Sequence, residues 1–336
     1  MNVSIIGAGL QGKRHASAIQ RLKGWRVVTV CDVNIERARA LAAHLNAEAT
    51  ASWEEVVRWP GVDAIAVCTP PHLHAPVSIA AMKEGKHVLC EKPLGRTAQE
   101  AQAMVMVAAE TGLKLKCGCN LRYHPAIVQA KQWLREGRIG SPLFLRCRYG
   151  IAGRPGSEKE WRAKGEISGG GELMDQGFHL LDLCRWFLGD FAEVFAFLAT
   201  NFWPIAPLED NAFLLLRTPQ AQVASLHVSW TYWKNLFSFE VFGRDGYIQL
   251  EGLGGNYGPE RAILGRRRFF QPVAEEVIEY RGEDCSWRQE WEEFLAAVRE
   301  DREPLGNGHD ALAVHRLVQA AYQSGRSGQL VRLQEV

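Results

Sequence analysis

The stretch that decides the fold is "VSIIGAGLQG", residues 3 to 12. A short apolar run ends in a G-x-G-x-x-G pattern made by Gly7, Gly9 and Gly12, and helix-forming residues follow it. Asp32 ends the next apolar run, about 20 residues beyond the last glycine, where a dinucleotide-binding unit places an acidic group. The pattern predicts a strand, a phosphate-binding loop and a helix.

Each glycine of this loop has a physical reason. Gly7 allows a tight turn, Gly9 lets a pyrophosphate approach the backbone, and Gly12 lets the helix pack close to the strand. The helix N-terminus attracts phosphate charge. We therefore expect the whole loop to bind a dinucleotide, with Leu10 and Gln11 included in the site.

Asp32 also predicts which dinucleotide is bound. Its carboxylate would accept hydrogen bonds from a ribose 2′-OH and repel a 2′-phosphate, which favours NAD over NADP. Arg37 and Arg39 could offset that repulsion, but two residues apart on a helix they are expected to be solvated. The predicted cofactor is NAD, with NADP the less favoured alternative.

The first 120 residues alternate strand-like and helix-like segments. Strand-like runs cover residues 3–7, 26–32, 63–70, 86–91 and 114–120. Helix-like stretches between them cover residues 34–45, 74–85 and 97–112. Because the strands are apolar throughout, both faces of their sheet must be covered. The segment predicts an α/β, doubly wound parallel sheet of the Rossmann type, over residues 1–120.

The pattern changes after residue 121. Helix-like segments at 124–137 and 172–188 combine with strand-like runs at 142–151, 222–230, 236–243 and 246–252. In the run at 222–230 small or polar residues alternate with apolar ones, as in a strand with one covered face. Residues 121–336 therefore predict a second, α+β domain, built on a large and mostly antiparallel open sheet with helices on one face. Its C-terminal helices, from about residue 287, are expected to pack back toward the first domain.

Composition narrows the class of protein. The chain has 336 residues, of which 47% are apolar and 23% charged, and its net charge is +1. These values are ordinary for a globular protein and favour neither a nucleic acid nor a membrane as partner. No apolar run approaches the ~18 residues of a membrane span, and no basic leader precedes the first strand. We expect a cytoplasmic protein.

The eight cysteines do not predict a disulfide framework. Several lie within apolar strand-like runs, as expected for buried thiols in a reducing compartment. Cys117 and Cys119 would point to the same face of a strand and could share a metal. No second Cys or His pair stands at ligand spacing, so no metal site is predicted.

Three further segments resemble one family. "CTPPHLH" (68–74), "GKHVLCEKPLG" (85–95) and "GGGELMDQGFHLLD" (169–182), together with the glycine loop, resemble the glucose-fructose oxidoreductase, inositol dehydrogenase and MocA (Gfo/Idh/MocA) group. The resemblance implies an oxidoreductase that transfers a hydride between nicotinamide and a secondary hydroxyl or keto carbon of a sugar, sugar nucleotide or cyclitol. It also implies that the open sheet joins subunits in a homo-oligomer, a dimer or a tetramer.

The third segment carries a polar stripe. On a regular helix Asp175, His179 and Asp182 share one face, and the glycines at 169–171 would let a ligand approach the backbone. The resemblance implies that His179 is the acid/base and that Asp175 binds substrate and orients His179. It further implies that Lys92, after an apolar strand, holds the reacting oxygen. A positive charge there would stabilise alkoxide character.

Weaker predictions concern residues near these motifs. Additional cofactor contacts are expected from Thr69, Pro70, His74, Glu91 and Lys92. Substrate contacts beyond the catalytic residues are expected from Arg122, Tyr123, Trp161 and Arg162. A plain turn, a helix cap or a purely structural role is the alternative for several of these residues.

Two other functions are open at this point. Some relatives of this type oxidise a glycoside transiently, eliminate the aglycone and reduce the sugar again, and so act as hydrolases. An NAD-responsive regulator would keep the fold without the chemistry. Lys92, Asp175 and His179 together favour an enzyme, because a pure sensor has no need of acid/base groups.

Overall fold

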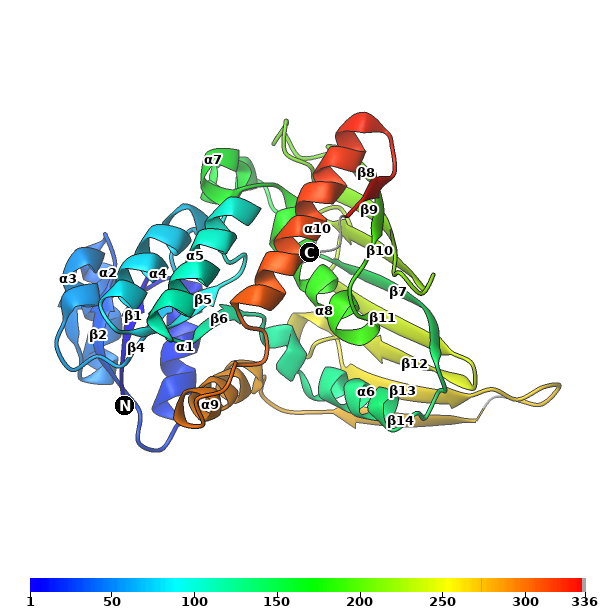
Figure 1. The fold of residues 1–336 in the computed structure, drawn as a ribbon, viewed down its shortest axis with the longest axis horizontal. Helices are drawn as coiled ribbons and strands as arrows, with labels where there is room; N and C mark the ends of the chain where they lie inside the picture. Colours follow the sequence, from blue (N-terminus) through cyan, green and yellow to red (C-terminus); the bar gives the residue numbers. More distant parts are fainter. Residues whose placement is uncertain (273, 334–336) are drawn as a thin grey trace. The chain divides into compact units, whose positions relative to one another are not determined.

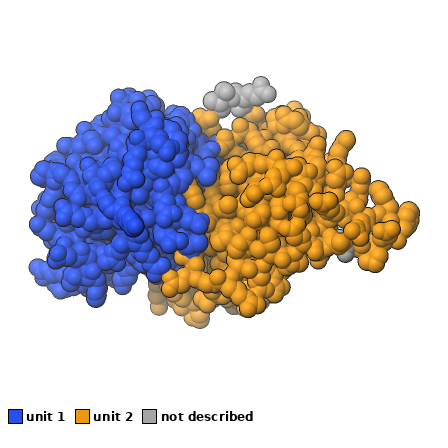
Figure 2. All heavy atoms as spheres, turned by 90° about the horizontal axis from the view of Figure 1, so that it is seen from below, with its two compact units in different colours: residues 1–120, 166–169, 285–315 blue, residues 121–165, 170–284, 316–336 orange. Residues whose placement is uncertain are grey.

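The computed structural model describes residues 1–272 and 274–333. The chain divides into two compact units, coloured separately in Figure 2. Unit 1 comprises Met1–Asn120, Glu166–Gly169 and Cys285–His315, and unit 2 comprises Leu121–Gly165, Gly170–Asp284 and Arg316–Val336. Segments far apart in the sequence thus belong to one unit.

Unit 1 contains a six-stranded parallel sheet with strand order β3-β2-β1-β4-β5-β6. Its strands are β1 (Asn2–Ile6), β2 (Arg26–Cys31), β3 (Glu48–Thr50), β4 (Ala64–Val67), β5 (His87–Glu91) and β6 (Leu115–Gly118). This is the strand order of a dinucleotide-binding Rossmann sheet, and it confirms the predicted doubly wound fold. The sequence prediction missed the short strand β3.

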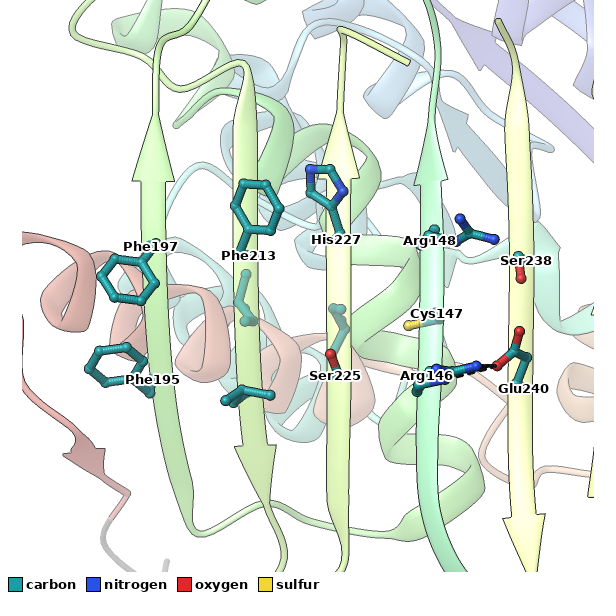
Figure 3. A pocket seen from close by; sticks show the side chains of 13 residues that line it. Arg146, Cys147, Arg148, Phe195, Phe197, Phe213, Ser225, His227, Ser238 and Glu240 are labelled. Carbon is teal, nitrogen blue, oxygen red and sulfur yellow. Dashed lines mark hydrogen bonds and ion pairs between the residues drawn. The ribbon is translucent and has the colours of Figure 1, made fainter.

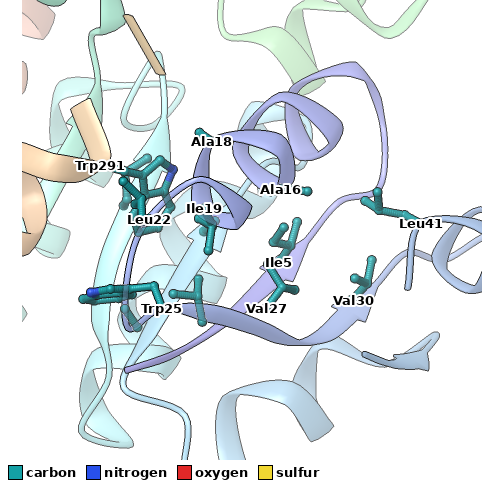
Figure 4. Packing of buried hydrophobic residues seen from close by; sticks show 14 of the residues in the cluster. Ile5, Ala16, Ala18, Ile19, Leu22, Trp25, Val27, Val30, Leu41 and Trp291 are labelled. Carbon is teal, nitrogen blue, oxygen red and sulfur yellow. The ribbon is translucent and has the colours of Figure 1, made fainter. Parts of the chain in front are cut away.

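Helices cover both faces of this sheet (Figure 1). They are α1 (Leu10–Gln20), α2 (Ile35–Leu45), α3 (Trp53–Arg58), α4 (His74–Lys83), α5 (Ala98–Thr111) and α9 (Ser286–Arg299). Apolar side chains of α1, α2 and α9 form a core with alternate residues of the strands, as Figure 4 shows for Ile5, Ile19 and Trp291. The other residues of each strand face α4, because side chains alternate along a strand.

Unit 2 contains a nine-stranded sheet with order β14-β13-β12-β11-β7-β10-β9-β8-β15. The strands are β7 (Pro142–Gly150), β8 (Glu193–Ala199), β9 (Asn211–Arg217), β10 (Val223–Ser229), β11 (Leu236–Gly243), β12 (Gly246–Glu251), β13 (Glu260–Arg266), β14 (Glu275–Tyr280) and β15 (Val331–Arg332). Strands β7 and β10 pair in parallel, and the other neighbours pair antiparallel. The predicted second sheet is therefore confirmed.

One face of this sheet is covered and the other is open. Helices α6 (Pro125–Arg135) and α8 (Phe178–Leu188) and the end of α10 (Gly308–Ser327) pack on the covered face. In β10 the predicted alternation is present: Ala224, Leu226 and Val228 are buried, whereas Val223 is exposed on the open face. Such alternation is typical of a strand packed on one side only.

The segment at 172–188 differs from the single regular helix that the sequence predicts. A π-helical turn, Leu173–Gly177, precedes α8. A π turn adds a residue to the helical repeat, so it rotates Asp175 relative to a regular helix. Short helices also occur at Pro71–Leu73, Asn120–Tyr123, Ser157–Lys159, Trp161–Ala163, α7 (Gly165–Ser168) and Gly255–Tyr257. No helix within the described ranges has the length and hydropathy needed to cross a membrane.

Candidate active site

The glycine loop lies at the carboxyl end of β1, between β2 and β4. Gly7 has φ +106°, and a Cβ there would lie 2.5 Å from the carbonyl oxygen of Cys68. A Cβ on Gly12 would lie 1.9 Å from the Gly7 carbonyl oxygen, so both positions require glycine. A Cβ on Gly9 would meet nothing within 4 Å, so the space before the loop is open. The predicted roles of these glycines thus match the local geometry.

Helix α1 starts from this loop with its N-terminal amides uncapped by any side chain and with no acidic residue in its first turn. By contrast, the Asn34 side chain caps α2, and that of Thr97 caps α5. An uncapped N-terminus is suited to a phosphate group. Leu10 is 67% exposed here, and the Gln11 side chain accepts a hydrogen bond from Arg14 (3.1 Å).

Asp32 lies against the same loop. Its Oδ2 accepts a hydrogen bond from the Ala8 amide (2.9 Å), and its Oδ1 accepts one from the Asn34 amide (2.9 Å). These bonds fix the carboxylate at the end of β2, where a ribose hydroxyl can reach its remaining lone pairs. Arg39 is paired with Glu36 on the exposed face of α2 (2.8 Å).

The turn after β4 adds a polar atom suited to a ligand. The Oγ1 atom of Thr69 is buried and has no hydrogen-bond partner among the described residues. Its carbonyl oxygen contacts Nε2 of His74 (2.7 Å), and Nδ1 of the same ring contacts the Pro93 carbonyl oxygen (2.7 Å). His74 therefore ties the turn that contains Pro70 to the turn that contains Lys92. The open loop, the fixed carboxylate and the buried hydroxyl fit a bound NAD.

Lys92 directly follows β5, and its bond to Pro93 is cis. The preceding Glu91 is buried, and its Oε2 accepts a hydrogen bond from the Lys92 amide (3.2 Å). Burial opposes ionisation of Glu91, but a hydrogen bond to His15 and the Lys92 charge outweigh it, so the net pKa of Glu91 is lowered. Glu91 is thus a buried carboxylate that holds the Lys92 turn.

In unit 2, the π turn presents Asp175 beside Arg162. The Nε atom of Arg162 lies 3.4 Å from Oδ2 of Asp175, and both side chains are partly exposed. The same guanidinium stacks over the Trp161 ring, 4.3 Å from its centroid. Three predicted substrate-site residues from two segments therefore lie together. An aromatic face beside a guanidinium and a carboxylate is suited to a polyhydroxylated ring.

His179 is 7% exposed and lies in the first turn of α8. Its ring contacts the edge of Tyr149, with centroids 6.2 Å apart, and Tyr149 in turn contacts Tyr257 at 5.5 Å. Burial and neighbouring acidic groups hold the pKa of Tyr149 well above its ordinary value, so its phenol stays protonated. The sequence analysis missed both tyrosines. The end of the strand-like run at 142–151 was the available signal for Tyr149.

The glycines at 169–171 do not serve the role expected of them. A Cβ on Gly170 would lie 2.1 Å from the Tyr322 hydroxyl, and one on Gly171 would lie 2.2 Å from the Glu209 carbonyl oxygen. The space beside these glycines is therefore filled by protein, which corrects the expectation that a ligand approaches there. Glu209 also accepts hydrogen bonds from the Leu173 amide (3.0 Å) and from Tyr322 (2.9 Å). These bonds fix the start of the π turn, and sequence reasoning identified neither Glu209 nor Tyr322 as part of the site.

Arg122, predicted as a substrate contact, is 2% exposed and paired with Asp182. Its Nε and one terminal nitrogen donate to the two carboxylate oxygens, at 2.7 and 2.6 Å. This two-point ion pair also takes Asp182 out of the polar stripe that was expected on the helix. The adjacent Tyr123 is 6% exposed. The contacts favour a structural role for Arg122.

A separate hollow of about 500 Å³ lies on the open face of the unit 2 sheet (Figure 3). Side chains of β7–β11, including Arg148, Phe197, Phe213 and His227, line it. None of the predicted cofactor, catalytic or substrate residues is among its lining residues. The hollow is thus distinct from the candidate site.

Comparison with known proteins agrees with these features. Residues 1–119 match a family model described as an oxidoreductase family with an NAD-binding Rossmann fold, and residues 127–249 match the GFO/IDH/MocA C-terminal domain. The chain is 34% identical over 285 residues to levoglucosan dehydrogenase of Pseudarthrobacter phenanthrenivorans, covering 74% of this chain and 73% of the relative. The chain belongs to the Gfo/Idh/MocA oxidoreductase family.

Other members of the Gfo/Idh/MocA family show similar likeness. The 1,5-anhydro-D-fructose reductase of Ensifer adhaerens is 32% identical over 246 residues, covering 73% of this chain and 74% of the relative. A solved structure of levoglucosan dehydrogenase in complex with NADH superimposes with a TM-score of 0.91 at 24% identity, covering 100% of both chains. The predicted family, its NAD cofactor and its oxidoreductase class are confirmed.

Proposed function

We propose that this Gfo/Idh/MocA protein transfers a hydride between NAD and a secondary hydroxyl or keto carbon of a sugar, a sugar nucleotide or a cyclitol. The observation that carries this proposal is the place of Lys92 at the carboxyl end of β5. The glycine loop and Thr69 follow β1 and β4 at the same edge of the sheet. Open parallel sheets bind their ligands at this edge.

In the proposed reaction Lys92 and His179 divide the work on one hydroxyl group. The Lys92 ammonium donates a hydrogen bond from Nζ to the reacting oxygen and stabilises its developing negative charge. A ring nitrogen of His179 accepts the hydroxyl proton as the carbon is oxidised, and returns it in the reverse direction. Bound NAD supplies the nicotinamide carbon that takes or gives the hydride. Asp175 binds the substrate and orients His179.

The relatives and the contacts of unit 2 support a ring-shaped substrate. Levoglucosan and 1,5-anhydro-D-fructose, named for the two relatives above, are anhydro sugars. Trp161 presents an aromatic face, and Arg162 and Asp175 beside it offer a donor group and an acceptor group. We infer that the preferred substrate is a single sugar or cyclitol ring, with its face against Trp161 and its hydroxyls toward the charged pair.

The test is an assay of NADH absorbance over a panel of free sugars, anhydro sugars, inositols, sugar acids and sugar nucleotides. The wild type is expected to turn over at least one member. A Lys92→Ala variant should bind NADH as the wild type does and lose hydride transfer by on the order of 10²- to 10³-fold. Lys83→Ala, which changes an exposed lysine of α4, is the matched control.

Two results of this assay contradict the proposal. Undiminished turnover by Lys92→Ala removes the role given to Lys92. Cleavage of a glycoside without net NADH formation instead indicates the redox-elimination hydrolase. A wild type that binds NADH and turns over no member of the panel indicates a regulator.

We also propose that the open face of the unit 2 sheet joins copies of this chain. Phe197, Phe213 and Leu215 are 64%, 45% and 51% exposed there, and Figure 3 shows the two aromatic rings on neighbouring strands. Exposed apolar patches of this kind mark interaction surfaces. Leu215→Glu should lower the molar mass measured by light scattering to that of a monomer. Lys234→Glu, outside the strands, is the control, and an unchanged mass for Leu215→Glu contradicts the proposal.

We infer a reducing, cytoplasmic location for the protein. All eight cysteines are free, and six of them are buried. Buried thiols without disulfides are usual in reducing compartments. Fractionation of the native cells with an antibody to this chain tests the inference, and recovery in an extracytoplasmic fraction contradicts it.

A further inference from the structure

A chain of hydrogen bonds lies beneath the Lys92 turn within unit 1. Trp291 Nε1 donates to Nδ1 of His15 (2.9 Å), and Nε2 of His15 contacts Oε1 of Glu91 (2.9 Å). The other carboxylate oxygen of Glu91 accepts the bond from the Lys92 amide. The relay therefore connects helices α9 and α1 with the end of β5.

The direction of every bond in this relay is fixed. An indole N–H can only donate, so Nδ1 of His15 must be the acceptor. The proton of a neutral His15 ring is then on Nε2, which donates to the Glu91 carboxylate. Trp291 thus selects the one neutral tautomer of His15 that can bind Glu91.

Trp291 is itself held rigidly. It is fully buried in the unit 1 core, where Figure 4 shows it beside Leu22. Its ring lies 5.7 Å from that of Phe294 and 6.4 Å from that of Trp25, and it meets the His15 ring edge-on at 84°. A donor fixed by close packing gives the relay a rigid origin.

We infer that His15 and Trp291 are positioning residues that set the direction of the Lys92 side chain by fixing Glu91 and, through it, the Lys92 backbone. This inference rests on the proposed role of Lys92. His15 and Trp291 both have a relative exposure of 0%, so they act through Glu91 rather than by contact with a substrate. A misplaced Lys92 would weaken stabilisation of the reacting oxygen, because such effects depend on tight geometry.

Two near-isosteric variants of His15 test the inference. The side-chain amide of Gln reaches the position of Nε2 and can donate to Glu91, whereas that of Asn reaches only the position of Nδ1. His15→Gln should therefore keep kcat within about threefold of the wild type. His15→Asn should lower kcat by on the order of 10- to 100-fold, the loss expected when a buried charged group loses its hydrogen bond. The KM for NAD should be unchanged in both.

The pattern across the two variants decides the matter. Recovery of kcat in His15→Gln but not in His15→Asn supports a positioning role. Equal kcat in both, whether at the wild-type level or equally low, overturns it, because a purely structural histidine would not distinguish the two amides. If the wild type itself turns over no substrate, the proposed function fails first.

A second measurement does not depend on turnover. Nitrogen NMR of the His15 ring should report the tautomer protonated at Nε2 in the wild type with NAD bound. In Trp291→Phe, which removes the donor and keeps an aromatic ring, the other tautomer should appear and kcat should fall by about threefold to tenfold. A wild-type ring protonated at Nδ1, or an unchanged tautomer in Trp291→Phe, overturns the inference.

Discussion

The two groups of candidate residues are held in different ways. In unit 1 the Lys92 turn is fixed by Glu91, His15 and Trp291, which are all buried. In unit 2, Asp175 lies in a π turn, and the side chain of its partner Arg162 is 42% exposed. Removing a buried hydrogen bond costs much more than removing an exposed ion pair. We infer that unit 1 fixes the chemistry and that the half-exposed contacts of unit 2 adjust the choice of substrate.

The sharpest test of the unit 2 group is His179→Ala. Loss of the acid/base should lower kcat by on the order of 10²- to 10⁴-fold and should remove one limb of the pH profile. The affinity for NADH, followed by fluorescence, should not change. His44→Ala, at an exposed histidine of α2, is the control. An unaltered rate and pH profile would mean that His179 only packs against Tyr149.

Unit 2 also contains a buried contact that is predicted to be costly to break. Arg122→Leu leaves the Asp182 carboxylate buried without its partner, and should lower the free energy of unfolding by about 3–5 kcal/mol. The double variant Arg122→Leu/Asp182→Leu should recover part of that loss, since no buried charge remains. Urea unfolding measures both. A stable Arg122→Leu protein with impaired substrate binding would return Arg122 to the substrate site.

Glu91→Gln tests the buried relay of unit 1 through pH. Although burial raises the pKa of Glu91, the His15 bond and the Lys92 charge lower it further, so the folded pKa is below the ordinary value. The carboxylate therefore stabilises the fold above about pH 4.3, and this contribution is lost as the pH falls through the folded pKa. At neutral pH the variant should be less stable by about 1.5–3 kcal/mol. The gap should close on acidification, and a pH-independent gap contradicts the account.

The smallest expected effect is that of Arg162→Ala. Because the ion pair with Asp175 is partly exposed, its loss should cost no more than about 1 kcal/mol and raise the substrate KM by no more than about fivefold. The value of kcat should stay close to that of the wild type. Arg154→Ala, which breaks an exposed pair with Glu160, is the control. A loss of kcat above tenfold would show that Arg162 takes part in the chemistry.

The fold of unit 1 was predictable because its signals are local. The glycine loop stands directly between a strand and a helix, and uninterrupted apolar runs mark the buried parallel strands. Strand β3 was missed because its three residues, Glu48–Thr50, carry no apolar run. The order of the strands followed from the resemblance to the Rossmann fold rather than from any one segment.

The candidate site was predictable only where it follows a motif. Lys92, Asp175 and His179 lie in motifs, whereas Tyr149, Glu209 and Tyr322 reach the same region from distant segments. The π turn could not be read from its residues, because LMDQG has no composition that distinguishes a π turn from a regular helix. The partner of Arg122 lies 60 residues away in the sequence, so its pairing with Asp182 depends on the tertiary fold.

The central claim is that Lys92 of unit 1 and His179 of unit 2 act on the same hydroxyl in one chemical step. A double-mutant cycle of Lys92→Ala and His179→Ala, measured as kcat/KM on the best substrate of the panel, tests it most directly. Residues that act as a unit give non-additive losses. The account predicts that the double variant is within about tenfold of the worse single variant. Losses that multiply would show that the two residues act independently, and would contradict it.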